Sequence, residues 1–131
     1  MRFNKRALGL VAGIVLVVLS VPALAHHSIP SFWKEEASIT VTGTVKQIRI
    51  MNPHSEIQLD VTDPNGQTAT WVAIGSSASG MVKAGWKNDV FKVGTKITVE
   101  GAPPRREGAK GVLIRTVQGP DGSKFSLRTV D

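Results

Sequence analysis

The chain has 131 residues, and its 16 Lys and Arg residues outnumber its 10 Asp and Glu residues, which gives a formal net charge of +6. It contains no cysteine and no tyrosine, which excludes disulfide bonds, thiolate metal sites, cysteine nucleophiles and phenolic acid–base chemistry. This length is enough for one small domain with a single hydrophobic core.

The first 25 residues have the organisation of a cleavable signal peptide. Three basic residues precede an uncharged, mostly apolar stretch at 7–19, and the segment ends in Ala23-Leu24-Ala25, the small-x-small pattern that signal peptidase cuts after. The alternative is an uncleaved membrane anchor, because residues 7–25 approach the ~20 residues needed to span a bilayer. We expect cleavage, and with it a periplasmic or secreted location in a bacterium.

Cleavage after Ala25 also changes the charge of the protein. The mature chain has 106 residues (131 − 25) and a net charge of +3, because three of the 16 basic residues and none of the 10 acidic residues are removed (13 − 10). This small excess is not typical of a dedicated nucleic-acid-binding protein. We expect a leader at 26–38, a single domain at 39–131 and no membrane partner after cleavage.

The first predicted strand begins at Ile39. Residues 39–45 alternate apolar and threonine side chains, the pattern of a half-buried strand. The apolar phase then shifts to Ile48 and Ile50, which predicts a β-bulge near Lys46-Gln47. The segment Met51-Asn52-Pro53-His54 is the first predicted loop, because proline cannot donate a hydrogen bond to a central ladder.

A hairpin and a short helix are predicted next. Strand-like runs at 57–61 and 68–74 flank Asp63-Pro-Asn-Gly66, a strong turn signal. The helix is expected over Ser76–Ala84, with Ser76 or Ser77 as its N-cap and Gly85 as its end.

The last part of the chain predicts three more strands, separated by a basic Pro/Gly loop and a tight turn. These strands are expected at 96–100, 112–117 and 124–127. Three strands, a helix and then two or more strands is the element order of an OB-fold. We therefore expect an all-β domain with one short helix, built as an OB-fold-like, five- to six-stranded, partly open Greek-key barrel. A plain antiparallel β-sandwich is the alternative, and the helix favours the barrel.

The three histidines suggest a metal site. Cleavage after Ala25 would give His26 a free α-amine, which can chelate a metal together with the ring Nδ1, and His54 can add a third nitrogen, as in a histidine brace. His27 offers a second route through amine, amide and imidazole, and Met51 a thioether suited to Cu(I). Such ligands favour Cu(II) over Zn(II). The alternatives are a solvated His26-His27 pair, a capping role for His54 and a core position for Met51.

A second candidate surface combines Arg105, Arg106 and Lys110 with Trp71. On an OB-fold, basic and aromatic side chains can bind single-stranded nucleic acid. The export signal and the mature charge of +3 instead favour a periplasmic protein or a small anionic ligand as the partner. The sequence has no Ser-His-Asp order, P-loop or HExxH motif. We therefore predict no enzymatic activity.

Five motifs together resemble those of a family of small exported bacterial proteins of unknown function. They are Ala25-His26-His27-Ser28, Val41–Val45, Asn52-Pro53-His54, Gly85-Trp86 and Lys92–Gly101. The resemblance covers essentially the whole mature chain and implies the fold and the exported location, but no substrate. Ser55 departs from the family pattern, which often has an aromatic or aliphatic residue after the NPH motif.

These observations predict a periplasmic binding protein that binds copper through His26 and His54, with His27 and Met51 as possible additional ligands. It would act as a carrier, a chaperone or a sensor component. The prediction depends on cleavage after Ala25, because only cleavage creates the amine. The alternative is a metal-free binding module that holds a protein or an anionic small molecule on its barrel face and its Arg105-Arg106 loop.

Overall fold

The structure is a computed structural model that describes residues 28–127. The expected signal peptide, its cleavage site and both His26 and His27 lie outside these residues. The chain divides into a unit that ends at Ser31 and a second unit that begins at Phe32. A short helix that the sequence did not predict, α2 (Ser28–Phe32), spans this division. No helix within residues 28–127 is long and apolar enough to cross a bilayer.

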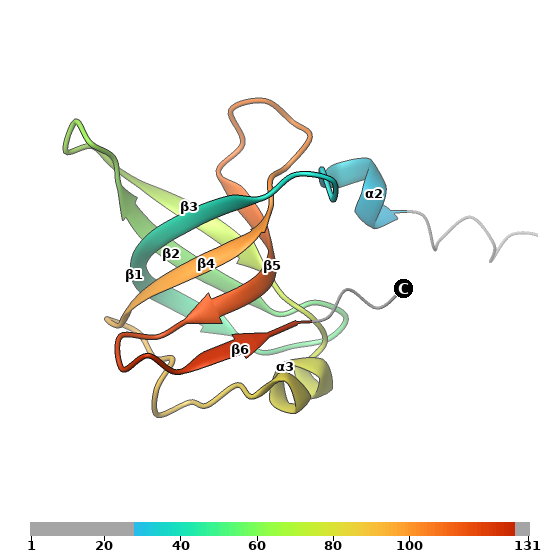
Figure 1. The fold of residues 1–131 in the computed structure, drawn as a ribbon, viewed down its shortest axis with the longest axis vertical. Helices are drawn as coiled ribbons and strands as arrows, with labels where there is room; N and C mark the ends of the chain where they lie inside the picture. The colour runs from blue at the N-terminus through green and yellow to red at the C-terminus, as the bar shows by residue number, and fades with distance from the viewer. Residues whose placement is uncertain (1–27, 128–131) are drawn as a thin grey trace, which may run out of the picture. The chain divides into compact units, whose positions relative to one another are not determined.

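Six strands of the second unit form one continuous sheet that closes on itself (Figure 1). The elements are β1 (Ile39–Arg49), β2 (Glu56–Thr62), β3 (Thr68–Ile74), α3 (Ala78–Ala84), β4 (Lys96–Ala102), β5 (Gly111–Gln118) and β6 (Lys124–Ser126). The strand order is β3-β2-β1-β4-β5-β6, and β3 also pairs with β5 in parallel. This pairing closes β1–β5 into a barrel, with β6 as an additional strand beside β5. The predicted all-β, OB-like barrel is confirmed, and the sandwich alternative is excluded.

Strand β1 pairs with two neighbours because it bends at a bulge. Its first half pairs with β4, from Ile39 to Thr44, and its second half pairs with β2. The register with β2 shifts between Val45 and Gln47, which confirms the bulge predicted from the change of apolar phase. Gly43 lies before the bulge, where an added Cβ would be 2.8 Å from the Asp60 carbonyl oxygen, so glycine allows the two strands to approach closely.

The helix α3 is capped at both ends by residues that the sequence singled out. The Ser77 hydroxyl accepts a hydrogen bond from the Gly80 amide at 3.2 Å, so Ser77, and not Ser76, is the N-cap. Gly85 ends the helix in the left-handed conformation, with a φ of 106°. Met81 is completely buried, which fixes the helix across one end of the barrel.

Three aromatic rings close the barrel at the same end. Trp86 and Phe91, in the connection after α3, have ring centroids 5.3 Å apart, and Phe125 of β6 packs edge-on to Phe91 at 5.0 Å. The Trp86 indole donates a hydrogen bond to Asn88. Trp86 therefore fills the core, and β6 contributes the third ring of the cluster.

Side-chain hydrogen bonds stabilise two turns between strands. In the β2–β3 hairpin, the Asp63 carboxylate accepts from the amides of Asn65 and Gln67, both at 2.9 Å. In the β5–β6 turn, the amide and hydroxyl of Ser123 donate to Asp121. These bonds favour the carboxylate form and lower the pKa of Asp121.

Candidate functional site

The loop between β1 and β2 is fixed to the chain that precedes α3. The Ser55 amide donates to the Ser76 carbonyl at 2.8 Å, and the Gly75 amide donates to the Ser55 carbonyl at 2.7 Å. Ser55 is completely buried, and its hydroxyl lies 3.3 Å from the Met51 amide nitrogen and 3.4 Å from the Met51 carbonyl oxygen. A larger side chain would not fit these contacts, so Ser55 closes the loop on itself.

Asn52 attaches the same loop to the helix. Its side-chain oxygen accepts a hydrogen bond from the Ala78 amide at 3.1 Å. Ala78 is the first residue of α3, and its amide has no acceptor within the helix. The peptide bond between Asn52 and Pro53 is cis. The NPH motif thus combines a capping side chain with a loop that leads directly to His54.

Replacement of Asn52 by alanine should destabilise the domain by about 1 kcal/mol, because the Ala78 amide loses its acceptor. Asn52→Asp is the matched control, since a carboxylate keeps the acceptor and adds a favourable charge at a helix start. Urea unfolding followed by tryptophan fluorescence measures both. Equal midpoints for the wild type and Asn52→Ala would show that this bond does not stabilise the loop.

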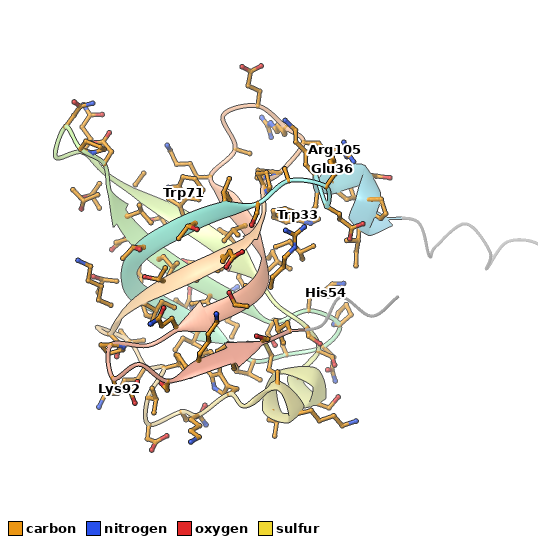
Figure 2. The ribbon with its side chains drawn as sticks, in the orientation of Figure 1. Trp33, Glu36, His54, Trp71, Lys92 and Arg105 are labelled. Carbon is orange, nitrogen blue, oxygen red and sulfur yellow. The ribbon has the colours of Figure 1, made fainter. Side chains whose placement is uncertain are left out.

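His54, labelled in Figure 2, and Met51 are both exposed on the fixed loop. The Met51 side chain is 47% exposed, which excludes the alternative of a core position. The His54 ring forms no hydrogen bond or ion pair with another described residue, so the alternative of a capping imidazole is also not observed. Both side chains are therefore accessible to a ligand from solvent.

Within residues 28–127, no group of three or more His, Asp or Glu side chains could hold a metal ion. His54 and Met51 together supply one imidazole and one thioether. The other two predicted ligands, His26 and His27, lie outside the described residues. The described part of the chain therefore contains only two of the four predicted ligands.

The predicted basic and aromatic surface is partly neutralised by the chain itself. The Lys110 ammonium lies 6.0 Å from the centre of the Trp71 ring, within range of a cation–π interaction. Arg105 forms an ion pair with Glu36 at 3.4 Å, and Arg106 is exposed. Figure 2 shows Arg105 and Glu36 side by side, apart from His54.

Trp33 lies at the same end of the barrel as Arg105 and was not among the predicted site residues. It forms a β-bridge with Pro104, and its ring covers Gly111, where an added Cβ would lie 3.3 Å from the indole. Backbone hydrogen bonds join the segment 32–34 to 103–105 on both sides of this bridge. A lone tryptophan in a polar leader gave no periodic signal, so the sequence did not reveal this packing.

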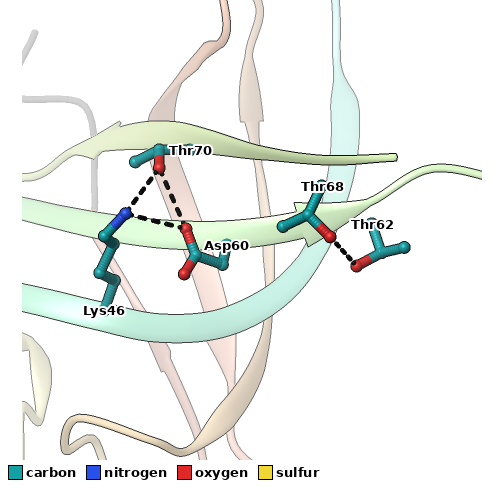
Figure 3. A network of polar contacts seen from close by, with 5 residues as sticks. All are labelled: Lys46, Asp60, Thr62, Thr68 and Thr70. Carbon is teal, nitrogen blue, oxygen red and sulfur yellow. Dashed lines mark hydrogen bonds and ion pairs between the residues drawn. The ribbon is translucent and has the colours of Figure 1, made fainter. Parts of the chain in front are cut away.

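A network of polar side chains crosses the outer face of β1, β2 and β3 (Figure 3). The Lys46 ammonium lies 3.4 Å from Asp60 and 3.1 Å from the Thr70 hydroxyl, which donates to Asp60 at 3.0 Å. Thr62 and Thr68 form a further cross-strand pair at 2.9 Å. These groups satisfy one another across the three strands, so they support the strand register.

The comparison with protein families gives one match. A family described as a family of unknown function, DUF6152, matches residues 13–114, which is most of the chain. The match ends within β5, so β6 and its Phe125 lie beyond it. The comparison with curated proteins gives no match.

Proposed function

We propose that this chain, which belongs to the DUF6152 family of unknown function, is a small exported copper-binding protein that acts as a carrier, a chaperone or a sensor component. One observation supports the proposal most directly. His54 and Met51 are exposed on a loop that is fixed by the buried Ser55 and by the bond from Ala78 to Asn52. A fixed loop lowers the entropy lost when its side chains bind a ligand.

The chemistry of the proposed ligands favours copper. The imidazole of His54 binds Cu(II) and Cu(I), and the thioether of Met51 favours Cu(I). A mature chain that begins at His26 would add an α-amine and a second imidazole, with His27 as a further nitrogen donor. Nitrogen ligands of this kind bind Cu(II) more tightly than Zn(II). A pair of ligands that suits both oxidation states is appropriate for a protein that carries or senses copper.

The mature protein is expected to bind one Cu(II) ion, and acetylation of the His26 α-amine should weaken binding by at least about 100-fold, because the α-amine is then an amide nitrogen. The experiment is a competition titration against a chelator of known affinity. His54→Ala should also weaken Cu(II) binding. Met51→Leu should weaken Cu(I) binding and leave Cu(II) binding unchanged.

The state of the amino terminus must be established in the same experiment. Native mass spectrometry of the protein purified after export gives both the first residue and any bound metal. A chain that begins at His26 and binds Cu(II) with equal affinity before and after acetylation of its α-amine would contradict the amino-terminal chelate. A chain that keeps residues 1–25 would contradict the whole ligand set.

A further inference from the structure

Three of the four large hydrophobic side chains that are exposed within residues 28–127 lie at the end of the barrel that carries α3, and the fourth, Phe32, belongs to the opposite end, where its carbonyl accepts a hydrogen bond from the Arg105 amide. Within residues 28–127, the large hydrophobic side chains that are exposed are Phe32, Met51, Val82 and Val93. Val82 lies on α3, and Met51 lies in the loop attached to the start of α3 through Asn52. Val93 lies in the connection after α3, which runs along the same end in Figure 1. We call this surface, made of residues 51–54 and 82–96, the α3 end.

The α3 end also carries the positive charge of the domain. Residues 82–96 contain four lysines and one acidic residue, Asp89, a net charge of +3 (4 − 1). Residues 28–127 contain 12 basic and nine acidic residues, which is also +3 (12 − 9), so the rest of the described domain is neutral in sum. The four lysines are all exposed, and they are Lys83, Lys87, Lys92 and Lys96.

These lysines are available to an external partner. None forms a salt bridge with another described residue. Lys87 is near enough to Asp121 to help lower the pKa of that carboxyl, after the larger effect of its hydrogen bonds to Ser123. At the opposite end, Arg105 is paired with Glu36 and Lys110 lies over Trp71, whereas Arg106 is exposed. Figure 2 shows Lys92 and Arg105 at opposite ends of the barrel.

We propose that the α3 end is a membrane-docking surface, which places the protein reversibly on a bilayer that contains anionic lipids. Lysines that surround exposed apolar side chains are the pattern of interfacial membrane binding. The sequence alone predicted no membrane partner for the cleaved chain, whereas the fold places the loop that carries Met51 beside the start of α3. The inference does not depend on copper and extends beyond the proposed function.

The composition of the surface favours a lipid partner over an acidic protein. All four basic residues are lysines, which are depleted in protein–protein interfaces, whereas arginine and aromatic residues are enriched there. The aromatic side chains of this region, Trp86 and Phe91, are buried in the core. The exposed apolar side chains are instead two valines, Val82 and Val93, and one methionine, Met51. Shallow insertion of such side chains, together with the charge of lysines near headgroups, gives weak and salt-sensitive binding.

The test is sedimentation of the protein with vesicles. The protein is expressed from its full reading frame, purified after export, freed of metal with a chelator and mixed with phosphatidylglycerol–phosphatidylcholine or pure phosphatidylcholine vesicles. We expect binding to the anionic vesicles at low salt and its loss at about 0.5 M salt, where the Debye length is only a few ångströms. Pure phosphatidylcholine should bind little protein.

Two variants with equal net charge make the test specific. Replacement of the four lysines of the α3 end by glutamine should lower the partition coefficient by at least about 100-fold, since each lysine near an anionic surface contributes roughly fivefold. The matched control replaces Lys34, Arg105, Arg106 and Lys110 by glutamine and should lower it much less. A double variant, Val82→Ser with Val93→Ser, should weaken binding without any change of charge.

Three outcomes would overturn the proposal. One is equal binding by the two glutamine variants, because net charge alone would then be responsible. Another is binding of every variant to neutral vesicles that is as strong as its binding to anionic vesicles. The third is loss of vesicle binding in excess soluble polyglutamate combined with no effect of the valine substitutions, which would identify the surface as a site for acidic polypeptides. Circular dichroism of each variant verifies that the barrel is intact.

Discussion

Replacement of Gly101 by alanine is expected to remove at least about 3 kcal/mol of stability, a large part of the 5–15 kcal/mol typical of a domain. Gly101 lies in β4 at an irregularity of the β4–β5 ladder, where the register shifts after Glu100. An added Cβ would overlap the Leu113 carbonyl oxygen and would lie 2.8 Å from the Leu113 carbonyl carbon and 2.9 Å from Val112 Cγ2. The overlapping group is backbone in a paired strand, so no side-chain rotation can relieve the clash.

Gly108→Ala is the matched control for this variant. Gly108 has a positive φ of 75°, but no atom lies within 4 Å of the position of an added Cβ. Alanine there should therefore lose only about 1–2 kcal/mol from its left-handed backbone conformation. Urea unfolding curves of the two variants separate the steric clash at Gly101 from the backbone strain at Gly108. Destabilisation by Gly101→Ala no greater than that by Gly108→Ala would show that β5 moves away at little cost and that the close approach of β4 to β5 does not require glycine.

Phe125→Ala is expected to destabilise the domain by about 3–5 kcal/mol, because it empties the centre of the aromatic cluster. Phe125 is 3% exposed and contacts both Trp86 and Phe91, with centroids 5.8 and 5.0 Å away. Its strand, β6, has only three residues and lies at the edge of the sheet. The ring therefore provides most of what holds β6 in place, and its loss should also expose Trp86.

The matched control is Phe32→Ala, which removes the same ring from a side chain that is 66% exposed. It should change the unfolding midpoint very little. In Phe125→Ala, the tryptophan emission of the folded protein should also shift to longer wavelength, since water would reach the Trp86 indole. A small loss of stability with unchanged emission would show that β6 contributes little to the core.

The regular parts of this fold could be predicted from the sequence because local patterns determine them. The alternation from Ile39 to Val45 gives the first strand, and the phase shift at Ile48 gives the bulge. The turn at Asp63 and the ends of α3 at Ser77 and Gly85 follow from side-chain hydrogen bonds and backbone freedom within a few residues. Such signals do not depend on distant parts of the chain.

The long-range features could not be predicted in the same way. Gly101 seemed to mark the end of a strand, whereas β4 continues to Ala102, because the glycine allows β5 to approach. The bond from Ala78 to Asn52 joins residues 26 positions apart. The sequence identified His54 as a candidate ligand, but the roles of Asn52 and Ser55 in holding its loop depend on where α3 packs.

The closure of the barrel by β3 and β5 has a consequence for how the chain folds. Val72 pairs with Gly111, 39 residues later (111 − 72), and this pairing must form against the entropy of the intervening chain. Folds dominated by such distant contacts fold in milliseconds to seconds, more slowly than helical bundles of similar size. A chain that is still emerging, from a ribosome or across a membrane, cannot complete the barrel until β5 is available. Until then β3 has an unpaired edge, and an unpaired strand edge favours aggregation of the incomplete chain.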